Sequence, residues 1–123
     1  MSLNPVTTSA AAAPAGPYSQ AIAANGFVFA SGQRPVHPET GKIEEDFSAQ
    51  VHQVLQNLAA VLKSAGSDLS KVVRVNIYLS DIGAFDEMNK IYTTYFREPY
   101  PARTTVACTL RGIMVEIDAV AVA

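Results

Sequence analysis

Three charged residues near the C-terminus could do chemistry, because the segments around them are otherwise apolar or small. In the stretch PYPARTTVACTLRGIMVEIDAVAVA, Arg103 lies near the start, and Glu116 and Asp118 lie near the end. A guanidinium can hold a carboxylate through two parallel hydrogen bonds, and a carboxyl group can accept and return protons. Polar clefts of this kind bind small ligands.

The positions of these residues depend on how the last two expected strands pair. If Arg111-Gly112 is a two-residue turn, Arg103 opposes Val120 and Glu116 opposes Ala107, and opposed side chains share a face. A slip of one residue would reverse the faces. The pairing predicts four residues on the face that helices leave uncovered: Arg103, Thr105, Glu116 and Asp118. It predicts three that point to the helices: Thr104, Val106 and Cys108.

The rest of the chain predicts an α+β fold in the order β-β-α-β-α-β-β, with both helices on one face of a sheet. Asn25-Gly26 indicates a hairpin between residues 18–24 and 27–31. Apolar spacing predicts helices over 46–66, capped by Asp46, and over 81–96. Between them, strand 71–80 alternates, and its predicted inward row is Val73, Val75, Ile77 and Leu79.

Length and composition favour one small domain that associates with copies of itself. We expect a flexible or weakly paired arm over 1–15 and a single domain over 16–123. Of the 123 residues, 49% are hydrophobic and 16% are charged, which is apolar enough that a partner subunit should cover some surface. The net charge of −2 argues against a nucleic-acid binder.

Other patterns bear on compartment and cofactors. No apolar run approaches the roughly 20 residues of a membrane helix, and the start does not read as a signal peptide. The single cysteine, Cys108, excludes an internal disulfide and fits a reducing compartment, so we expect a cytoplasmic protein. His37 and His52 have no companions at ligand spacing. We therefore expect no metal site and no organic cofactor.

The sequence resembles the RidA/YjgF family of small imine deaminases. The resemblance runs over nearly the whole chain, through the stretches APAGPYSQA, FASGQRPVHPETG, QVLQNL, FDEMNKIYTTYF, YPARTTV and VEIDAVAV. It implies a chorismate-mutase-like fold and a homotrimer whose sheets form a central barrel, with a site between neighbouring subunits. It also implies hydrolysis of reactive enamines and imines, such as 2-aminoacrylate and 2-aminocrotonate and their imine tautomers, to 2-oxo acids and ammonia.

The resemblance assigns roles residue by residue. The essential arginine of the family falls on Arg103 and its acid on Glu116, which the resemblance makes the catalytic pair. Where relatives often have a cysteine whose main-chain carbonyl helps to hold the attacking water, this chain has a threonine. The implied substrate-binding residues are Tyr18, Ser31, Gly32, Asn89 and Thr105.

Each residue also has a structural interpretation, and two other functions stay open. Arg103 and Glu116 could form bridges at a subunit boundary, and Asp118 could bond main chain or a basic neighbour. The same cleft could belong to a non-catalytic module that binds a small carboxylate and signals through a partner. A ribonuclease or translation inhibitor, as some relatives are described, fits the acidic composition least. The fold alone does not decide between these functions.

Overall fold

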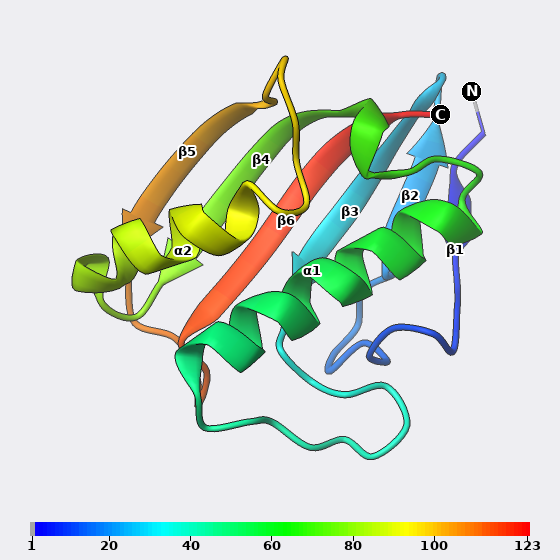
Figure 1. Cartoon of the computed structure of the whole chain (residues 1–123). Helices are drawn as coiled ribbons and strands as arrows, with labels where there is room; N and C mark the ends of the chain where they lie inside the picture. Colours follow the sequence, from blue (N-terminus) through cyan, green and yellow to red (C-terminus); the bar gives the residue numbers. More distant parts are fainter. Residues whose placement is uncertain (1) are drawn as a thin grey trace.

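The computed structural model describes residues 2–123, which form a six-stranded sheet with two α-helices on one face (Figure 1). The strands are β1 (Asn4–Val6), β2 (Ala21–Ala24), β3 (Phe27–Gln33), β4 (Val72–Leu79), β5 (Ala102–Ala107) and β6 (Val115–Val122). The helices are α1 (Phe47–Ser64) and α2 (Phe85–Tyr92), and short 3-10 helices η1 (Leu69–Lys71) and η2 (Ile82–Ala84) precede β4 and α2. The α+β class and the predicted order from β2 onward are confirmed.

The last two strands do not form a hairpin, so the predicted pairing is wrong. The sheet order is β1-β2-β3-β6-β4-β5. Strand β6 lies antiparallel between β3 and β4, and β5 lies parallel to β4 at the sheet edge, with Arg103 beside Val75. A parallel pair requires a crossover connection, and η2 and α2 supply it.

Correcting the pairing moves β5 side chains to the opposite faces. Arg103 and Thr105 share the face of Val75 and Ile77, which are fully buried beneath the helices. Thr104 lies on the open face, where it accepts a 2.6 Å hydrogen bond from the Arg74 guanidinium. Val106 and Cys108 are exposed, so neither packs beneath the helices as predicted.

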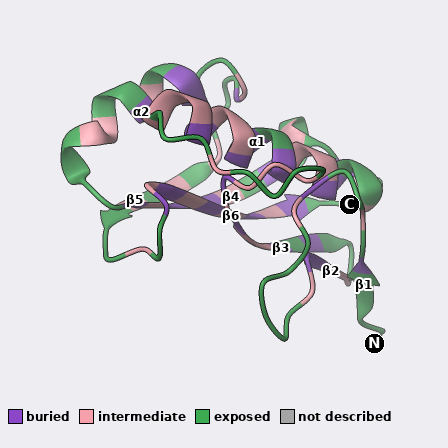
Figure 2. Cartoon of the chain, turned by 90° about the horizontal axis from the view of Figure 1, so that it is seen from below, coloured by how far each residue is buried: buried purple, intermediate pink, exposed green. Residues whose placement is uncertain are grey.

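The core lies between the sheet and the helices (Figure 2). The inward row of β6 consists of Val115, Ile117, Ala119 and Ala121, all of them buried. In β4, a register shift between Val72 and Arg74 buries Val72 and leaves Val73 44% exposed, which corrects the predicted inward row. The open face keeps several large apolar side chains at 39–47% exposure: Phe27, Phe29, Val106 and Val122.

Helix α1 begins and ends close to the predicted residues. The Asp46 carboxylate accepts a 2.9 Å hydrogen bond from the Ala49 amide, as an N-cap residue does. Past Ser64, Gly66 adopts a φ of +81°, a left-handed conformation that favours glycine. Helix α2 is shorter than predicted: Tyr95 and Phe96 follow in a turn bonded to the Tyr92 carbonyl.

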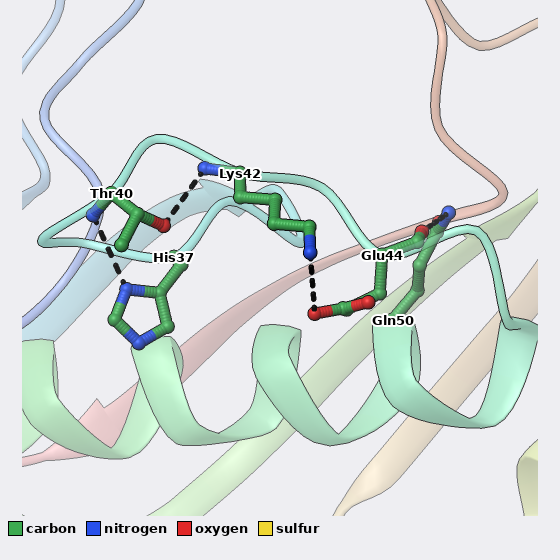
Figure 3. A network of polar contacts seen from close by, with 5 residues as sticks. All are labelled: His37, Thr40, Lys42, Glu44 and Gln50. Atoms are coloured by element: carbon green, nitrogen blue, oxygen red, sulfur yellow. Dashed lines mark hydrogen bonds and ion pairs between the residues drawn. The ribbon is translucent and has the colours of Figure 1, made fainter.

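The loop between β3 and α1 is held by its own polar groups and by α1 (Figure 3). His37 Nδ1 accepts from the Thr40 amide, and Lys42 lies 3.9 Å from the Glu44 carboxylate. Buried Gln50 donates to the Glu44 carbonyl at 2.7 Å and accepts from the Met114 amide at 2.8 Å. Helix α1 therefore positions both this loop and the start of β6.

The N-terminal segment lies along the sheet edge. Strand β1 pairs antiparallel with β2. Buried Gln20 then holds the chain that follows β1, because its side-chain amide accepts from the Thr8 amide and donates to the Thr8 and Ala12 carbonyls. Residue 1 of the arm expected over 1–15 lies outside the described residues.

Asn57 provides a test of how the loop is held. Its side chain is 1% exposed and donates to the Arg34 carbonyl at 3.1 Å and to the Val36 carbonyl at 2.9 Å. We expect Asn57→Ala to lower the free energy of unfolding by about 1–3 kcal/mol, because it leaves buried acceptors without a donor. Urea titration measures this, with exposed Gln56→Ala on the same helix as the control. Equal stability of both variants would contradict the assignment.

Candidate functional site

Arg103 lies beneath α2 and contacts three side chains of that helix. It donates a 2.7 Å hydrogen bond to Asn89 Oδ1. Its Cζ lies 4.8 Å from the Tyr92 ring centroid and 5.4 Å from that of Phe85, within the range of a cation–π contact. A guanidinium has five N–H donors in a planar fork, so donors remain after Asn89 is satisfied. The arginine is therefore fixed and still able to bind an anion.

A hollow of about 340 Å³ opens beside this arginine. Its lining residues are Asn89, Tyr92, Thr93, Tyr100, Pro101 and Arg103. Burial raises the pKa of the Tyr92 hydroxyl, although the nearby Arg103 acts in the opposite direction. Within residues 2–123, the buried Tyr92 hydroxyl and Thr105 Oγ1 have no hydrogen-bond partner. Unpaired buried polar atoms cost stability, and native proteins contain few of them.

Glu116 lies on the open face against Gly32, in a second group of residues. A Cβ at position 32 would stand 2.9 Å from the Glu116 Cδ and closer still to Oε2. The absent side chain therefore makes room for the carboxyl group. Five residues line the adjoining hollow of about 360 Å³: Tyr18, Ser31, Gly32, Arg34 and Glu116.

Three influences act on the Glu116 carboxyl, two of which raise its pKa and one of which lowers it. Burial raises its pKa, Arg34 lowers it through its positive charge, and Asp118 raises it through like-charge repulsion. The net result is a pKa above the ordinary value of 4.5. A raised pKa makes the Glu116 carboxylate a better proton acceptor than an ordinary glutamate.

Tyr18 and Ser31 are arranged by the main chain around them. The Tyr18 ring is 45% exposed, and its hydroxyl accepts a 3.0 Å hydrogen bond from the Ala15 amide. The Ser31 hydroxyl donates to the Ser19 carbonyl at 2.6 Å. Ser31 therefore ties β3 to the segment that carries Tyr18.

Asp118 has a structural role on the open face. It accepts hydrogen bonds of 2.9 Å from the side-chain amide of Asn76 and from the Tyr78 hydroxyl, both on neighbouring β4. The bond to Asp118 raises the pKa of Tyr78. The geometry supports a structural role for Asp118, but its partners are two neutral side chains and not the main chain or basic neighbour that was predicted.

The predicted site residues form two groups that do not meet within one chain. Arg103 pairs with Val75 and Glu116 pairs with Tyr78, and positions three apart on β4 point to opposite faces. Arg103, Asn89 and Thr105 lie on the helix side, whereas Tyr18, Ser31, Gly32 and Glu116 lie around the hollow on the open side. The backbones of Arg103 and Glu116 are also about 14 Å apart, because they are separated by two strand spacings of about 4.8 Å and by three residues with a rise of about 3.3 Å each.

Sequence reasoning missed the other residues that line these hollows, among them one arginine and two tyrosines. Arg34 lines the Glu116 hollow, and Tyr92 and Tyr100 line the Arg103 hollow. Tyr92 lies at the end of α2 and packs over Phe96 with ring centroids 4.5 Å apart, so in the sequence it resembles an ordinary core aromatic. No spacing in the sequence distinguishes Arg34 from an ordinary loop arginine.

Within residues 2–123, no group of three or more His, Cys, Asp or Glu side chains is gathered closely enough to hold a metal ion. In the same residues, neither helix has the length and apolar character required to cross a bilayer.

Comparisons with known proteins agree in one family. The family described as endoribonuclease L-PSP matches residues 8–123. A RutC family protein of Pyrococcus horikoshii is 43% identical over 119 residues, covering 94% of each chain. The chloroplastic Reactive Intermediate Deaminase A of Arabidopsis thaliana is 45% identical over 119 residues, covering 94% of this chain and 64% of the plant protein.

A solved structure supports the same assignment. The crystal structure of YyfA from Yersinia pestis, a protein of unknown function in the conserved Rid family, superposes with a TM-score of 0.95. The two chains are 40% identical, and the match covers 99% of this chain and all of the other. The fold, the matched residues and these relatives together show that the chain belongs to the endoribonuclease L-PSP family, which includes the RutC and Rid proteins.

Proposed function

We propose that the protein hydrolyses reactive enamines and imines, among them 2-iminopropanoate and 2-iminobutanoate, to 2-oxo acids and ammonia. The site forms between subunits of a homotrimer. One subunit supplies Arg103, Asn89 and Thr105, and its neighbour supplies Tyr18, Ser31, Gly32 and Glu116. The plant relative named Reactive Intermediate Deaminase A supports this chemistry.

The observation that supports a shared site most is the separation of Arg103 from Glu116 by the sheet itself. A substrate a few atoms long cannot contact both groups of one chain. A second copy that covers the open face could bring its own Arg103 to the first copy's Glu116. Exposed Phe27, Phe29 and Val122 give that face the apolar area that a subunit interface needs. Head-to-tail contacts around a three-fold axis close into a ring.

The proposed reaction uses groups that are already in position. Arg103, fixed by Asn89 and Tyr92, binds the substrate carboxylate. The main-chain carbonyl of Thr105 helps to hold a water molecule against the imine carbon. Glu116 accepts a proton as the water oxygen bonds to that carbon, and then returns the proton to nitrogen. Glu116 then takes the proton of the new hydroxyl group and passes it to the nitrogen as the C–N bond breaks, so that ammonia leaves and the 2-oxo acid remains.

Ribonuclease activity is not favoured, although the family is described as endoribonuclease L-PSP. The net charge of −2 is opposite to that of a typical RNA-binding surface. The open face presents apolar side chains together with Glu116 and Asp118, and phosphates are repelled by such carboxylates. A non-catalytic carboxylate-binding module would use Arg103 in the same way but would not require Glu116, so substitution of Glu116 separates that function from hydrolysis.

The shared site predicts that assembly and activity are lost together. We expect Phe29→Asp to be monomeric by light scattering at micromolar concentration, because it places a charge on the 47% exposed ring position of the open face. Its far-UV circular dichroism should match wild type, and its imine hydrolysis should fall below detection. Ile82→Asp is the matched control, since Ile82 is 52% exposed on η2. A monomeric wild type that hydrolyses imines would exclude a shared site.

Arg103 is expected to be the least replaceable residue. Arg103→Lys keeps the charge but loses the planar, two-point grip on a carboxylate, so kcat/KM for 2-iminobutanoate should fall by about 10²-fold or more. Arg103→Ala should abolish measurable turnover while the trimer persists. Stopped assays of 2-oxo acid release from freshly generated imine measure both. Near-normal turnover in an intact Arg103→Ala trimer would rule out the mechanism.

Glu116 is expected to set the acid limb of the pH profile. The ionised carboxylate accepts the proton of water, so kcat should rise as pH increases through the pKa of Glu116. Because that pKa is raised, the limb should lie above pH 4.5. Glu116→Gln should lower kcat by about 10²–10⁴-fold with a smaller effect on KM, and it should lack the limb. A Glu116→Gln profile with an unchanged limb would show that another group accepts the proton.

A further inference from the structure

Arg34 lies in the Glu116 half of the site, and the mechanism above leaves it without a role. It lines three adjoining hollows, of about 210, 700 and 360 Å³. Tyr18 lines all three with it, and Glu116 lines the second and third. A group held beside Glu116 by the neighbouring Arg103 would therefore face Arg34 as well.

Arg34 is held at both of its ends. Its carbonyl accepts a hydrogen bond from buried Asn57, which fixes the backbone against α1. Its guanidinium donates to the Arg111 carbonyl at 3.3 Å, and that loop is itself tied to α1 through Gln50 and Met114. A side chain held in this way loses little entropy when it binds a ligand.

The positive charge of Arg34 acts on the nearby Glu116, but within residues 2–123 it forms no ion pair of 4.0 Å or less. Within residues 2–123, the ion pair between Lys42 and Glu44 is the sole one at 4.0 Å or less. The Arg111 carbonyl uses one of five guanidinium N–H donors. When a neighbouring subunit encloses the cleft, the guanidinium loses water, and an unpaired charge in such a place is costly. A ligand carboxylate would remove that cost.

We propose that Arg34 is a specificity-determining residue that binds an acidic side chain on the substrate. This inference rests on the proposed function. Arg103 of one subunit binds the α-carboxylate, Glu116 of the next lies at the reacting carbon, and Arg34 holds a second carboxylate beyond it. The preferred substrates are then the 2-imino acids derived from amino dicarboxylic acids, and the hydrolysis itself is unchanged.

The test compares two imines of similar length that differ in side-chain charge. An amino-acid oxidase generates them in the assay from L-glutamate and from L-methionine, and the residual imine is trapped and quantified. Each is measured with wild type, with Arg34→Met, which removes charge and donors at similar volume, and with Arg97→Met. Arg97 is exposed and lines a different hollow, so it controls for net charge. Light scattering and thermal melts accompany each variant.

Wild type is expected to have the higher kcat/KM for the glutamate imine. Arg34→Met should lower the ratio of kcat/KM for the glutamate imine to kcat/KM for the methionine imine by about 10- to 100-fold, the range for losing hydrogen bonds between charged groups. Arg97→Met should leave this ratio unchanged. An equal fall for both imines would show that Arg34 merely supports the loop or binds the α-carboxylate. That result, or an unchanged ratio, would overturn the proposal.

Binding of products tests Arg34 separately from turnover. Calorimetry compares 2-oxoglutarate with 4-methylthio-2-oxobutanoate on wild type and Arg34→Met. The wild type should favour 2-oxoglutarate, and Arg34→Met should lose that preference. Failure of wild type to hydrolyse either imine would reject the proposed function, and the binding comparison would then still decide whether Arg34 selects a second carboxylate.

Discussion

Strand β5 can run parallel to β4 because α2 carries the chain back across the sheet between them. This crossover places the α2 side chains Phe85, Asn89 and Tyr92 directly over the edge strand. Arg103, whose side chain points to the same face, is thereby given a hydrogen-bond acceptor and two aromatic rings. In a hairpin with β6, the same arginine would have pointed to the open face. The orientation of one edge strand therefore decides where the cation of the site lies.

The open face of the sheet has two properties that a single copy of the chain does not reconcile. It exposes phenylalanine and valine side chains, which favours burial, and it holds Glu116 and the Asp118 network with Asn76 and Tyr78, which requires polar partners. The Asp118 network satisfies itself by hydrogen bonds within the sheet. Glu116 adjoins a hollow instead, because Gly32 leaves the space beside it free. A partner subunit that covers the apolar area while leaving this hollow accessible meets both requirements.

Helix α1 contributes to the site although none of its side chains line the hollows around Arg103 or Glu116. Its buried amides act as connectors. Asn57 fixes the backbone of Arg34, and Gln50 joins the loop before α1 to the segment that leads into β6. Both amides have their polar groups paired inside the protein, which makes the positions of Arg34 and Glu116 depend on core packing.

The sequence by itself determined the α+β class, the order of elements from the first hairpin onward, both ends of α1 and the alternation of β6, since all of these follow from local periodicity, caps and turn residues. It also supplied Arg103 and Glu116 as candidates through the family resemblance. Only the tertiary structure decided which strands are neighbours, and with that the face on which each candidate lies. Two observations could have warned against the hairpin: ARTTVA has three consecutive polar residues, one of them charged, as an exposed edge strand can have, and a helix between two strands favours a parallel pair. Arg34 could not be recognised from spacing, because its place beside Glu116 arises from contacts between residues about 80 positions apart, and local patterns contain no information about such contacts.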